Sequence, residues 1–395
     1  MTVESAAAPP ARVAFYNDPR VRSIGYQVVL CVIVALLVYE AVGNAIDNLQ
    51  RAHIASGFGF WDQAAGFDIS QTLIAYSSSA STYGDAFWVA LLNTLIVAVL
   101  GIVLATILGF AIGISRLSTN WLLAKVAAGY VETIRNIPLL LQLLFWYNAV
   151  LKALPDTRDS HRFFGTYLNN RGWFVPEPIP GAGFGWVETA LVIGIIASVA
   201  FYVWARKRQM QTGQQAPILW VVLGLVIVLP AIVFLLAGSP LHFDYPQLGR
   251  FNLNGGLALQ PEFVALLLGI SIYTAAFIAE VVRAGIMAVS RGQTEAAYSL
   301  GLRPGPTLRL VIIPQAMRVI IPPLTSQYLN LTKNSSLAVA IGYPDLVQVF
   351  TGTVLNQTGQ AVEVVAITML VYLSISLVTS LGMNIYNSRM ALVER

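Results

Sequence analysis

The sequence predicts an all-α polytopic membrane protein with about eight transmembrane helices, and two observations lead to that prediction. Only 11% of the 395 residues are charged, whereas 56% are hydrophobic and the mean hydropathy is +0.69. A soluble globular chain carries about 25% charged residues, so this chain has too few to cover a surface exposed to water. The second observation is a series of apolar runs, each long enough for an α-helix to cross a bilayer.

These runs divide the chain into eight expected spans. They cover residues 24–46, 86–114, 126–153, 186–205, 217–237, 261–283, 319–343 and 361–384. The first run is long for the apolar part of a signal peptide, and no A-x-A site follows it closely, so we expect an uncleaved helix. The third and seventh runs carry charge and proline. Pro138 removes a backbone hydrogen bond and is expected to kink the third helix.

The positive residues predict that both chain ends lie in the cytoplasm. Eight crossings place both ends on one side of the membrane. Fifteen of the 23 Lys and Arg residues, among them Arg12 and Arg395, fall on that side, against six in the opposite loops. Loops rich in Lys and Arg stay in the cytoplasm. Residues 47–85 and 154–185 are then external loops, and residues 283–318 form a cytoplasmic loop.

Several classes of function are disfavoured. The net charge of +4 is spread among short loops, which fits membrane orientation rather than a nucleic-acid partner. His53, His161 and His242 lie in separate loops without the spacing of metal ligands, and Cys31 is the single cysteine. No GxxxxGK[ST] phosphate loop occurs, so we expect no ATP hydrolysis by this chain. HExxH, GxSxG and Cys-x-x-Cys are also missing, which disfavours a membrane-embedded enzyme.

Three polar groups lie inside expected spans, where an unpaired charge is costly. The first contains Glu132, Arg135 and Asn136, just before Pro138. A spacing of three residues puts Glu132 and Arg135 on one helical face, where they can neutralise each other. Two interpretations stay open, namely a pair that positions a bent helix near the cytoplasmic boundary, and a gate on a substrate path.

The second group, Glu280 and Arg283, repeats the same spacing in the sixth span. Small residues surround this pair and would let another helix approach closely; they are Ala275, Ala276, Ala279 and Ala284. The third group is Lys333, Asn334 and Ser335, followed by Ser336, in the seventh span. These side chains are hard to explain as facing lipid. They favour a polar route or a subunit contact over a purely structural network.

The cytoplasmic stretch GQTEAAYSLGLRPGPTLRLVIIP, residues 292–314, interrupts two apolar runs. We expect a short helix from Gly292 to Leu300, with Thr294 as a cap and Gly301 as a C-terminal stop. Pro304 and Pro306 are expected to prevent its continuation. A helix of two turns is not stable alone in water, so it needs a partner to pack against. The segment presents a slim face at Ala296 and Ala297, a candidate plug at Leu300 and a single acid at Glu295.

This stretch resembles a known motif. Glu295-Ala296-Ala297, three residues, Gly301, nine residues, Val311, and then Ile313 and Pro314 are similar to the EAA loop of ABC importer permeases. Further segments resemble the polar amino acid branch of that family, the histidine/glutamine-type permeases; they are VETIRNIPLLLQLLFWY, TAAFIAEVVRAGI and IPQAMRVIIPPLTSQYLNLTKNSSLAVAIGYPDL. With the pair of spans inserted at 186–237, the whole chain is similar to the Q-type permeases of general L-amino-acid importers of Gram-negative bacteria.

The resemblance implies a division of the chain. A five-helix permease core is built from residues 86–153 and 261–395, and the latter part contains the EAA coupling loop 283–318. Residues 1–85 supply a cytoplasmic tail, an extra first span and a periplasmic loop. Residues 154–260 insert periplasmic loops and two extra helices. The minimal family form lacks the first span and this insertion.

The resemblance also implies partners. The chain would be the translocation subunit of an importer for L-amino acids, of broad or acidic and amide range, in the bacterial inner membrane. A second homologous permease, two ATPase subunits that use ATP and Mg, and a periplasmic amino-acid-binding protein would complete it, and this chain itself would bind no cofactor. The short helix would dock on the ATPase through a set of contact residues: Glu295, Ala296, Ala297, Leu300, Gly301 and Arg303.

Within the expected substrate path, Glu280 is a candidate for the amine of the amino acid. Lys333, Asn334 and Ser335 are candidates for its carboxylate or the polar network beside it. A rival interpretation is a secondary transporter coupled to protons or sodium, which would use the same intramembrane charges without ATP. Inverted repeats would favour that rival, and none is visible in the sequence.

Overall fold

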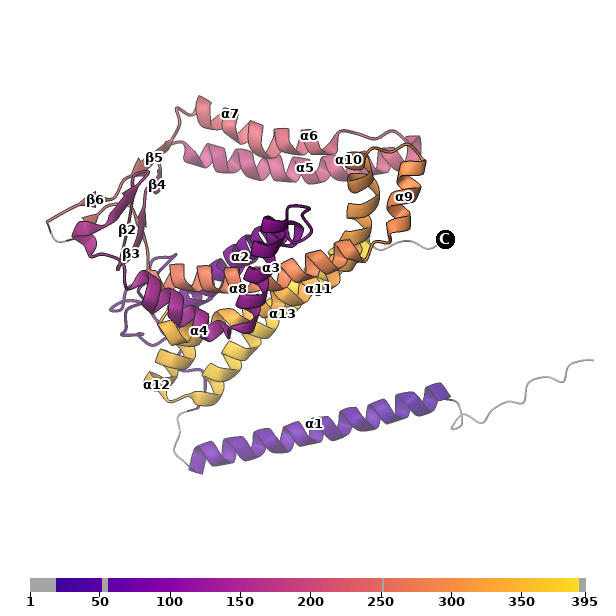
Figure 1. Cartoon of the computed structure of the whole chain (residues 1–395). Coiled ribbons are helices and arrows are strands. Elements are labelled where there is room, and N and C mark those ends of the chain that lie inside the picture. Colours follow the sequence, from indigo (N-terminus) through magenta and orange to yellow (C-terminus); the bar gives the residue numbers. More distant parts are fainter. Residues whose placement is uncertain (1–18, 52–55, 251, 391–395) are drawn as a thin grey trace, which may run out of the picture.

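A computed structural model describes residues 19–51, 56–250 and 252–390 (Figure 1). The expected cytoplasmic tail with Arg12, and also His53 and Arg395, lie outside the described residues. Seven helices in the described part are long and apolar enough to cross a membrane, and the number is eight if a pair bent at one break is counted as a single span. The expected helical, multi-span class is therefore confirmed, and the expected eight spans match when the bent pair is counted as one.

The spans in the described ranges follow the expected order. They are α1 (Pro19–Arg51), α2 (Tyr83–Ser115), the bent pair α3 (Trp121–Asn136) and α4 (Leu139–Leu144) with a π-helical end (Phe145–Leu151), α5 (Phe184–Thr212), α6 (Ile218–Leu223) with α7 (Leu229–Leu236), α8 (Pro261–Met287), α11 (Ile313–Asn334) and α13 (Ala361–Met390). Three short helices connect or extend them: α9 (Arg291–Ser299), α10 (Pro304–Thr307) and α12 (Leu355–Thr358).

The expected kink at Pro138 is confirmed and is sharp. The axes of α3 and the following helix differ by 105°. Ile137, the residue before the proline, has extended backbone angles (φ −99°, ψ 125°), as steric contact with the proline ring favours. The amide of Gln142 donates to the carbonyl oxygens of Ile134 and Ile137, both at 2.9 Å. The Gln142 side chain thus pairs the carbonyl of Ile137 at the break and adds a second hydrogen bond to that of Ile134, which also accepts from the Ile137 N–H at 3.4 Å.

The seventh span begins earlier than expected. The expected start was residue 319, whereas α10 starts at Pro304 and the helix runs on without a break to Ile341. The expectation that Pro304 and Pro306 prevent continuation of the preceding short helix is confirmed, because α9 ends at Ser299. Proline is well accommodated in the first turn of a helix, where its missing N–H group has no helical partner to lose. The loop expected at 283–318 is therefore mostly helical.

Helix α8 lies at the centre of the bundle and packs closely on α2. A Cβ atom added at Gly109 of α2 would lie 2.5 Å from Ile278 Cγ2, and one at Gly113 would lie 2.8 Å from the Ala279 carbonyl oxygen. Ala275, Ala276 and Ala279 are fully buried, so the expected close approach of a helix is confirmed there. It is wrong for Ala284, which is exposed; the adjacent Gly285 makes the close contact instead, with Ile320 of α11.

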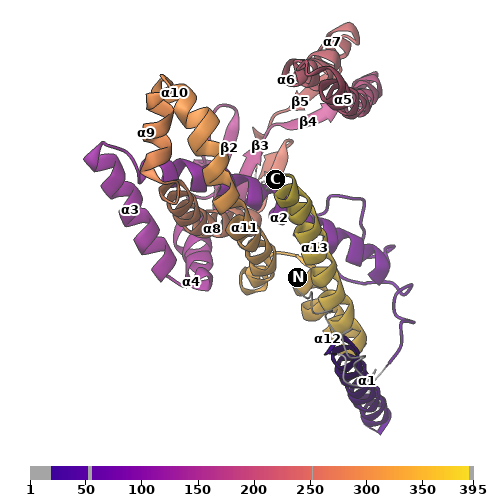
Figure 2. The ribbon, with the colours of Figure 1, turned by 90° about the vertical axis from the view of Figure 1, so that its right-hand side faces the viewer.

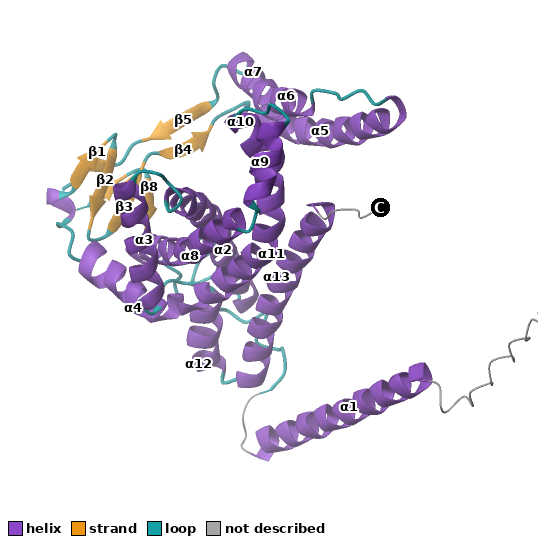
Figure 3. Cartoon of the chain, turned by 45° about the vertical axis from the view of Figure 1, so that its right-hand side comes forward, coloured by secondary structure: helices purple, strands orange, loops and turns teal. Residues whose placement is uncertain are grey.

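Small β-sheets, which the sequence interpretation did not include, fold the loops on either side of the inserted helices (Figures 1 and 3). A four-stranded antiparallel sheet has the order β1-β2-β3-β8, with β1 (His161–Phe163), β2 (Thr166–Asn169), β3 (Gly172–Val175) and β8 (Leu257–Leu259). Two further pairs join β4 (Glu177–Pro180) to β5 (Leu241–Asp244), and β6 (Gln247–Leu248) to β7 (Leu253–Asn254).

The inserted helices form a hairpin at the end of the β4–β5 pair. Strand β4 leads into α5, and α7 leads into β5. Figure 2 shows α5, α6 and α7 packed together. The approach is close because Gly194 of α5 has no side chain; a Cβ atom there would lie 2.1 Å from the carbonyl oxygen of Leu225.

Candidate functional site at one end of the bundle

The short helix expected at 292–300 is present as α9, between α8 and α10. Its N-cap is Ser290, so the expectation of a cap at Thr294 is wrong; Thr294 lies inside the helix. The stop at Gly301 is confirmed. Gly301 has φ +76°, its N–H donates to Tyr298 O at 2.9 Å, and the N–H of Leu302 donates to Ala297 O at 3.1 Å. This pair of bonds is the Schellman arrangement, which needs a left-handed residue after the helix.

One side of α9 packs on the start of the seventh span. Ala297 is 3% exposed, and the amide of Gln315 donates to Gln293 Oε1 at 3.2 Å. Of the expected slim face only Ala297 is buried, because Ala296 is exposed. The packing that a helix of two turns requires therefore comes in part from this chain itself, from α10 and the π-helical segment Leu308–Ile312, with the Gln315 bond reaching α11.

The other side of α9 is open. Leu300 is 82% exposed and Tyr298 is 49% exposed. Glu295, Ala296 and Arg303 are exposed as well. An exposed leucine beside a half-exposed tyrosine, fixed by a helix stop, is a surface suited to a contact with another protein. We call this set, Glu295, Ala296, Tyr298, Leu300 and Arg303, the α9 face.

Near the same end of the bundle, the carboxylate of Glu280 on α8 forms ion pairs with three arginines. Arg283 donates to its Oε1 from Nη2 at 2.5 Å and from Nε at 3.2 Å, so the expected pairing across three residues is confirmed. Arg116, which caps the C-terminus of α2, pairs with Oε2. Arg135 of α3 lies 4.0 Å from Oε2, and its guanidinium lies 5.0 Å from the ring centroid of Phe277. The cluster joins α2, α3 and α8.

The expected pairing of Glu132 with Arg135 is wrong. Glu132 is exposed, whereas Arg135 turns towards Glu280. The partly buried carboxylate and the aromatic face of Phe277 offer the guanidinium stronger interactions than an exposed carboxylate on its own helix. Asn136 donates from its side chain to the backbone carbonyl of Glu132 at 2.7 Å, and so helps to end α3. Arg116 was not among the predicted site residues. An arginine at the end of a span is expected simply because Lys and Arg gather in cytoplasmic loops.

The third polar group, Lys333, Asn334 and Ser335, lies at a different depth along the bundle from Glu280. Ser335 is buried and donates to Thr332 O at 2.8 Å, while Lys333 is exposed at the end of α11. A Cβ atom at Gly101 would meet both Leu331 of α11 and Ile270 of α8, so the end of α11 is level with Ile270. Glu280 follows ten residues later, about 15 Å along the helix at 1.5 Å per residue. The structure does not bring the two groups together.

Sequence reasoning missed a buried polar network around Asp345. This residue follows α11 and its 3₁₀-helical end; its side chain is fully buried, accepting from the Gln348 N–H at 2.8 Å and from the Tyr372 hydroxyl at 3.1 Å. Burial raises the pKa of the Asp345 carboxyl to about 7. Beside it, Thr94 Oγ1 accepts from the Leu346 N–H, and the Asn93 amide donates to Pro344 O, both at 3.0 Å. The network fixes the loop after α11 to α2 and α13.

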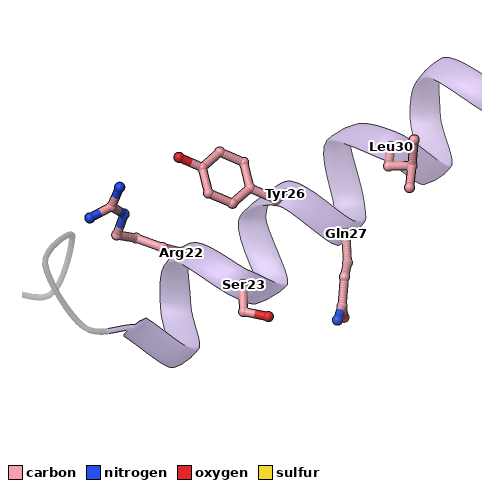
Figure 4. A pocket seen from close by; sticks show the side chains of 5 residues that line it. All are labelled: Arg22, Ser23, Tyr26, Gln27 and Leu30. Atoms are coloured by element: carbon pink, nitrogen blue, oxygen red, sulfur yellow. The ribbon is translucent and has the colours of Figure 1, made fainter.

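Two hollows in the described part of the chain lie away from the Glu280 and Asp345 groups. One lies along α1 and is lined by Arg22, Ser23, Tyr26, Gln27 and Leu30 from that single helix (Figure 4). Another, of about 610 Å³, lies between α2, α11 and α13 and is lined almost wholly by apolar side chains. Among the described residues, no group of three His, Cys, Asp or Glu could hold a metal ion.

A family model and two similar full-length proteins match this chain, and all three represent components of transport systems. The family model described as "Binding-protein-dependent transport system inner membrane component" matches residues 204–392. The general L-amino acid transport system permease protein AapQ of Rhizobium johnstonii is 55% identical over 385 residues, which cover 97% of this chain and 96% of the relative. The glutamate/glutamine/aspartate/asparagine transport system permease protein BztB of Rhodobacter capsulatus is 44% identical over 410 residues, which cover 96% of each.

Proposed function

The chain belongs to the binding-protein-dependent transport system inner membrane components, as an ABC transporter permease, and on that premise we propose that it moves L-amino acids into a bacterial cell. It is a multi-pass protein of a type found in the bacterial inner membrane. The names of the two relatives support a broad range of substrates that includes acidic amino acids and their amides.

We further propose that the α9 face is the contact with an ATPase subunit. The observation that carries this proposal is the left-handed stop at Gly301, which directs the 82% exposed Leu300 outwards from a helix anchored by Ala297. A force-transmitting contact must be rigid, and α9 packs directly on the helix that becomes α11. ATP and Mg would be bound by the partner, and the ends of the chain would share the cytoplasmic side with α9.

The remaining partners follow from the same premise. A second homologous permease and a periplasmic amino-acid-binding protein would complete the importer. In alternating access, closure of the ATPases would move α9, and α8 and α11 would move with it. The Glu280 cluster would then act as an inner gate, because it joins α2, α3 and α8 near the α9 end. This role differs from the binding of the substrate amine, for which a carboxylate already paired with arginines is poorly placed.

Transport by the reconstituted complex tests the function. Proteoliposomes that contain this chain, its sister permease and the ATPases are supplied with the binding protein, and uptake of radiolabelled glutamine and glutamate is measured. We expect uptake that requires internal ATP and stops when the phosphate-loop lysine of the ATPase is replaced. Uptake driven by a sodium or proton gradient without ATP would contradict the proposal.

Charge reversal on the α9 face tests the docking site. We expect Glu295→Lys to weaken copurification of the ATPase with this chain. The matched control is Asp159→Lys, an exposed acid reversed at the other end of the bundle, which should leave copurification unchanged. An equal yield of ATPase with the Glu295 variant and with the control would argue against docking at α9.

A further inference from the structure

The turn between β1 and β2 carries an unusual residue. Phe163 pairs with Thr166, so the turn consists of Phe164 and Gly165 alone. Their φ angles are +47° and +75°, as a tight turn of the type I′ kind requires. Asn and Gly usually occupy such positions, and a bulky residue with positive φ is strained. Phe164 is nevertheless there, and 98% of its side chain surface is exposed.

The neighbouring residue shows the depth at which this turn lies. Phe163 lines an apolar hollow of about 400 Å³ together with Leu104 of α2 and Leu267 of α8. Leu267 is six residues inside a membrane-spanning helix, about 9 Å along its axis. The ring of Phe163 also lies 6.1 Å from that of Trp173 on β3, which lines the same hollow. The inner side of the hairpin therefore packs against the part of the bundle that faces hydrocarbon.

The residues before the turn complete a pattern typical of a membrane boundary. Arg162 and His161 precede Phe163 and are exposed. The guanidinium of Arg162 lies 5.0 Å from the ring centroid of Tyr167. Aromatic rings are favoured at the boundary between headgroups and acyl chains, and arginine side chains reach from there to lipid phosphates. A phenylalanine that would be fully wetted in water gains free energy by entering this layer.

We propose that the β1–β2 turn is a membrane anchor, in which Phe164 enters the lipid boundary and Arg162 contacts the phosphate layer. The anchor holds the inserted sheet to the bilayer at the point where α8 begins. Strand β3 pairs with β8, through Trp173 and Leu259, and β8 is followed directly by α8. The sheet thereby gives the first turn of α8 a fixed support at the surface of the membrane.

Fluorescence quenching in nanodiscs tests the anchor. Cys31 is the single cysteine, so Cys31→Ser provides a background in which one new cysteine can be labelled with bimane. Label is placed by Phe164→Cys, and by Arg171→Cys in the exposed turn between β2 and β3 as the matched control. We expect lipids with a doxyl group on the acyl chain to quench bimane at 164 at least twofold more than at 171, and aqueous iodide to show the reverse order.

Two outcomes would overturn the anchor. Equal iodide quenching at the two positions, without quenching by doxyl lipid at 164, would place the turn in water. Loss of iodide quenching at 164 only when the purified binding protein is added would make the turn a protein-docking site instead.

A second variant separates anchoring from folding. Phe164→Asn suits the positive φ angle and removes the aromatic ring, so the hairpin should still form. We expect trypsin to cleave after Arg162 several-fold faster in this variant than in the unmodified chain in nanodiscs, and at equal rates in detergent. Equal rates in nanodiscs would contradict the anchor.

Discussion

The carboxylate of Glu280 on α8 pairs with the guanidinium of Arg116 at the end of α2. The same two helices interlock through Gly109 and Gly113 on one side and Ala275 and Ala279 on the other. The ion pair therefore fixes the register of a contact that small residues bring close. With Arg283 and Arg135 also present, one acid faces three bases, and the cluster depends on that acid.

Removal of the acid should weaken the bundle. In Glu280→Gln three guanidinium groups converge without a counter-charge, so we expect the free energy of unfolding to fall by about 2 kcal/mol. Uptake should fall more than tenfold, since the gate would no longer close. Denaturant unfolding in detergent and transport in proteoliposomes measure the two effects. Unchanged stability and uptake would remove the cluster from the mechanism.

The two arginines from other helices should not be equivalent. The Arg116 side chain is 13% exposed and pairs directly, whereas that of Arg135 is 40% exposed and lies 4.0 Å from the carboxylate. We expect coupling to Glu280 of about 1–2 kcal/mol for Arg116 in a double-mutant cycle, and less than about 1 kcal/mol for Arg135. Cycles built with Arg116→Gln and Arg135→Gln measure this; an inverted order would contradict the geometry.

Gly301→Val should uncouple transport without preventing membrane insertion. No heavy atom lies within 4 Å of a Cβ atom added at Gly301, so valine meets no steric clash there. Its destabilisation comes from backbone strain at a φ of +76° and is about 1–3 kcal/mol. Gly305→Val is the matched control, because that glycine also has open space but no positive φ. We expect uptake to fall at least tenfold in the first variant and little in the second, with equal amounts in the membrane. Gly301→Asn should retain much of the uptake.

The α2–α8 contact should not tolerate larger side chains. A Cβ atom at Gly113 would lie 2.8 Å from both the Ala279 carbonyl oxygen and Val282 Cβ, whereas one at Gly129 of α3 meets nothing within 4 Å. We expect Gly113→Leu to lower the free energy of unfolding by about 1–3 kcal/mol or more, and Gly129→Leu to change it little. Thermal unfolding of the purified chain provides the comparison. Equal midpoints for the two variants would mean that the helices do not pack as described.

Asp345 should make stability depend on pH. Burial raises the pKa of its carboxyl from 3.8 to about 7 in the folded chain, so the folded state binds the proton more tightly than the unfolded state does. The contribution of Asp345 to the free energy of unfolding is therefore fully present below about pH 4 and is lost as the pH rises towards 7. Asp345→Asn cannot ionise, so its stability relative to the unmodified chain should improve between pH 5 and pH 8. A difference that stays constant over this range would contradict a raised pKa.

Much of the architecture could be predicted because membrane spans leave a direct trace in composition. The apolar runs gave the eight spans, and Pro138 gave the kink, since backbone sterics act locally. The stop at Gly301 was also predictable, because few residues other than glycine accept its conformation. The two prolines were correctly expected to stop the short helix, but the seventh span was expected to start only at 319, because apolar composition does not show that proline also begins a helix well.

Side-chain pairing between helices was not predictable from spacing alone. A spacing of three residues on one helix correctly predicted the pair of Glu280 with Arg283. It failed for Glu132 with Arg135, because spacing takes no account of acceptors on other helices. Arg116 joined the cluster only through the packing of α2 on α8. The small sheets also escaped prediction, because strands such as β6 and β7 are only two residues long and carry no periodic pattern.

Site-specific photo-crosslinking at Leu300 tests the central claim most directly. A benzophenone amino acid replaces Leu300 in cells that express the complete importer, and the same amino acid at Phe164, also strongly exposed but remote from α9, is the control. Docking of the α9 face on the ATPase predicts a light-dependent adduct between this chain and the ATPase subunit from position 300 and none from position 164. An assembled, active complex that gives no ATPase adduct from position 300 would contradict it.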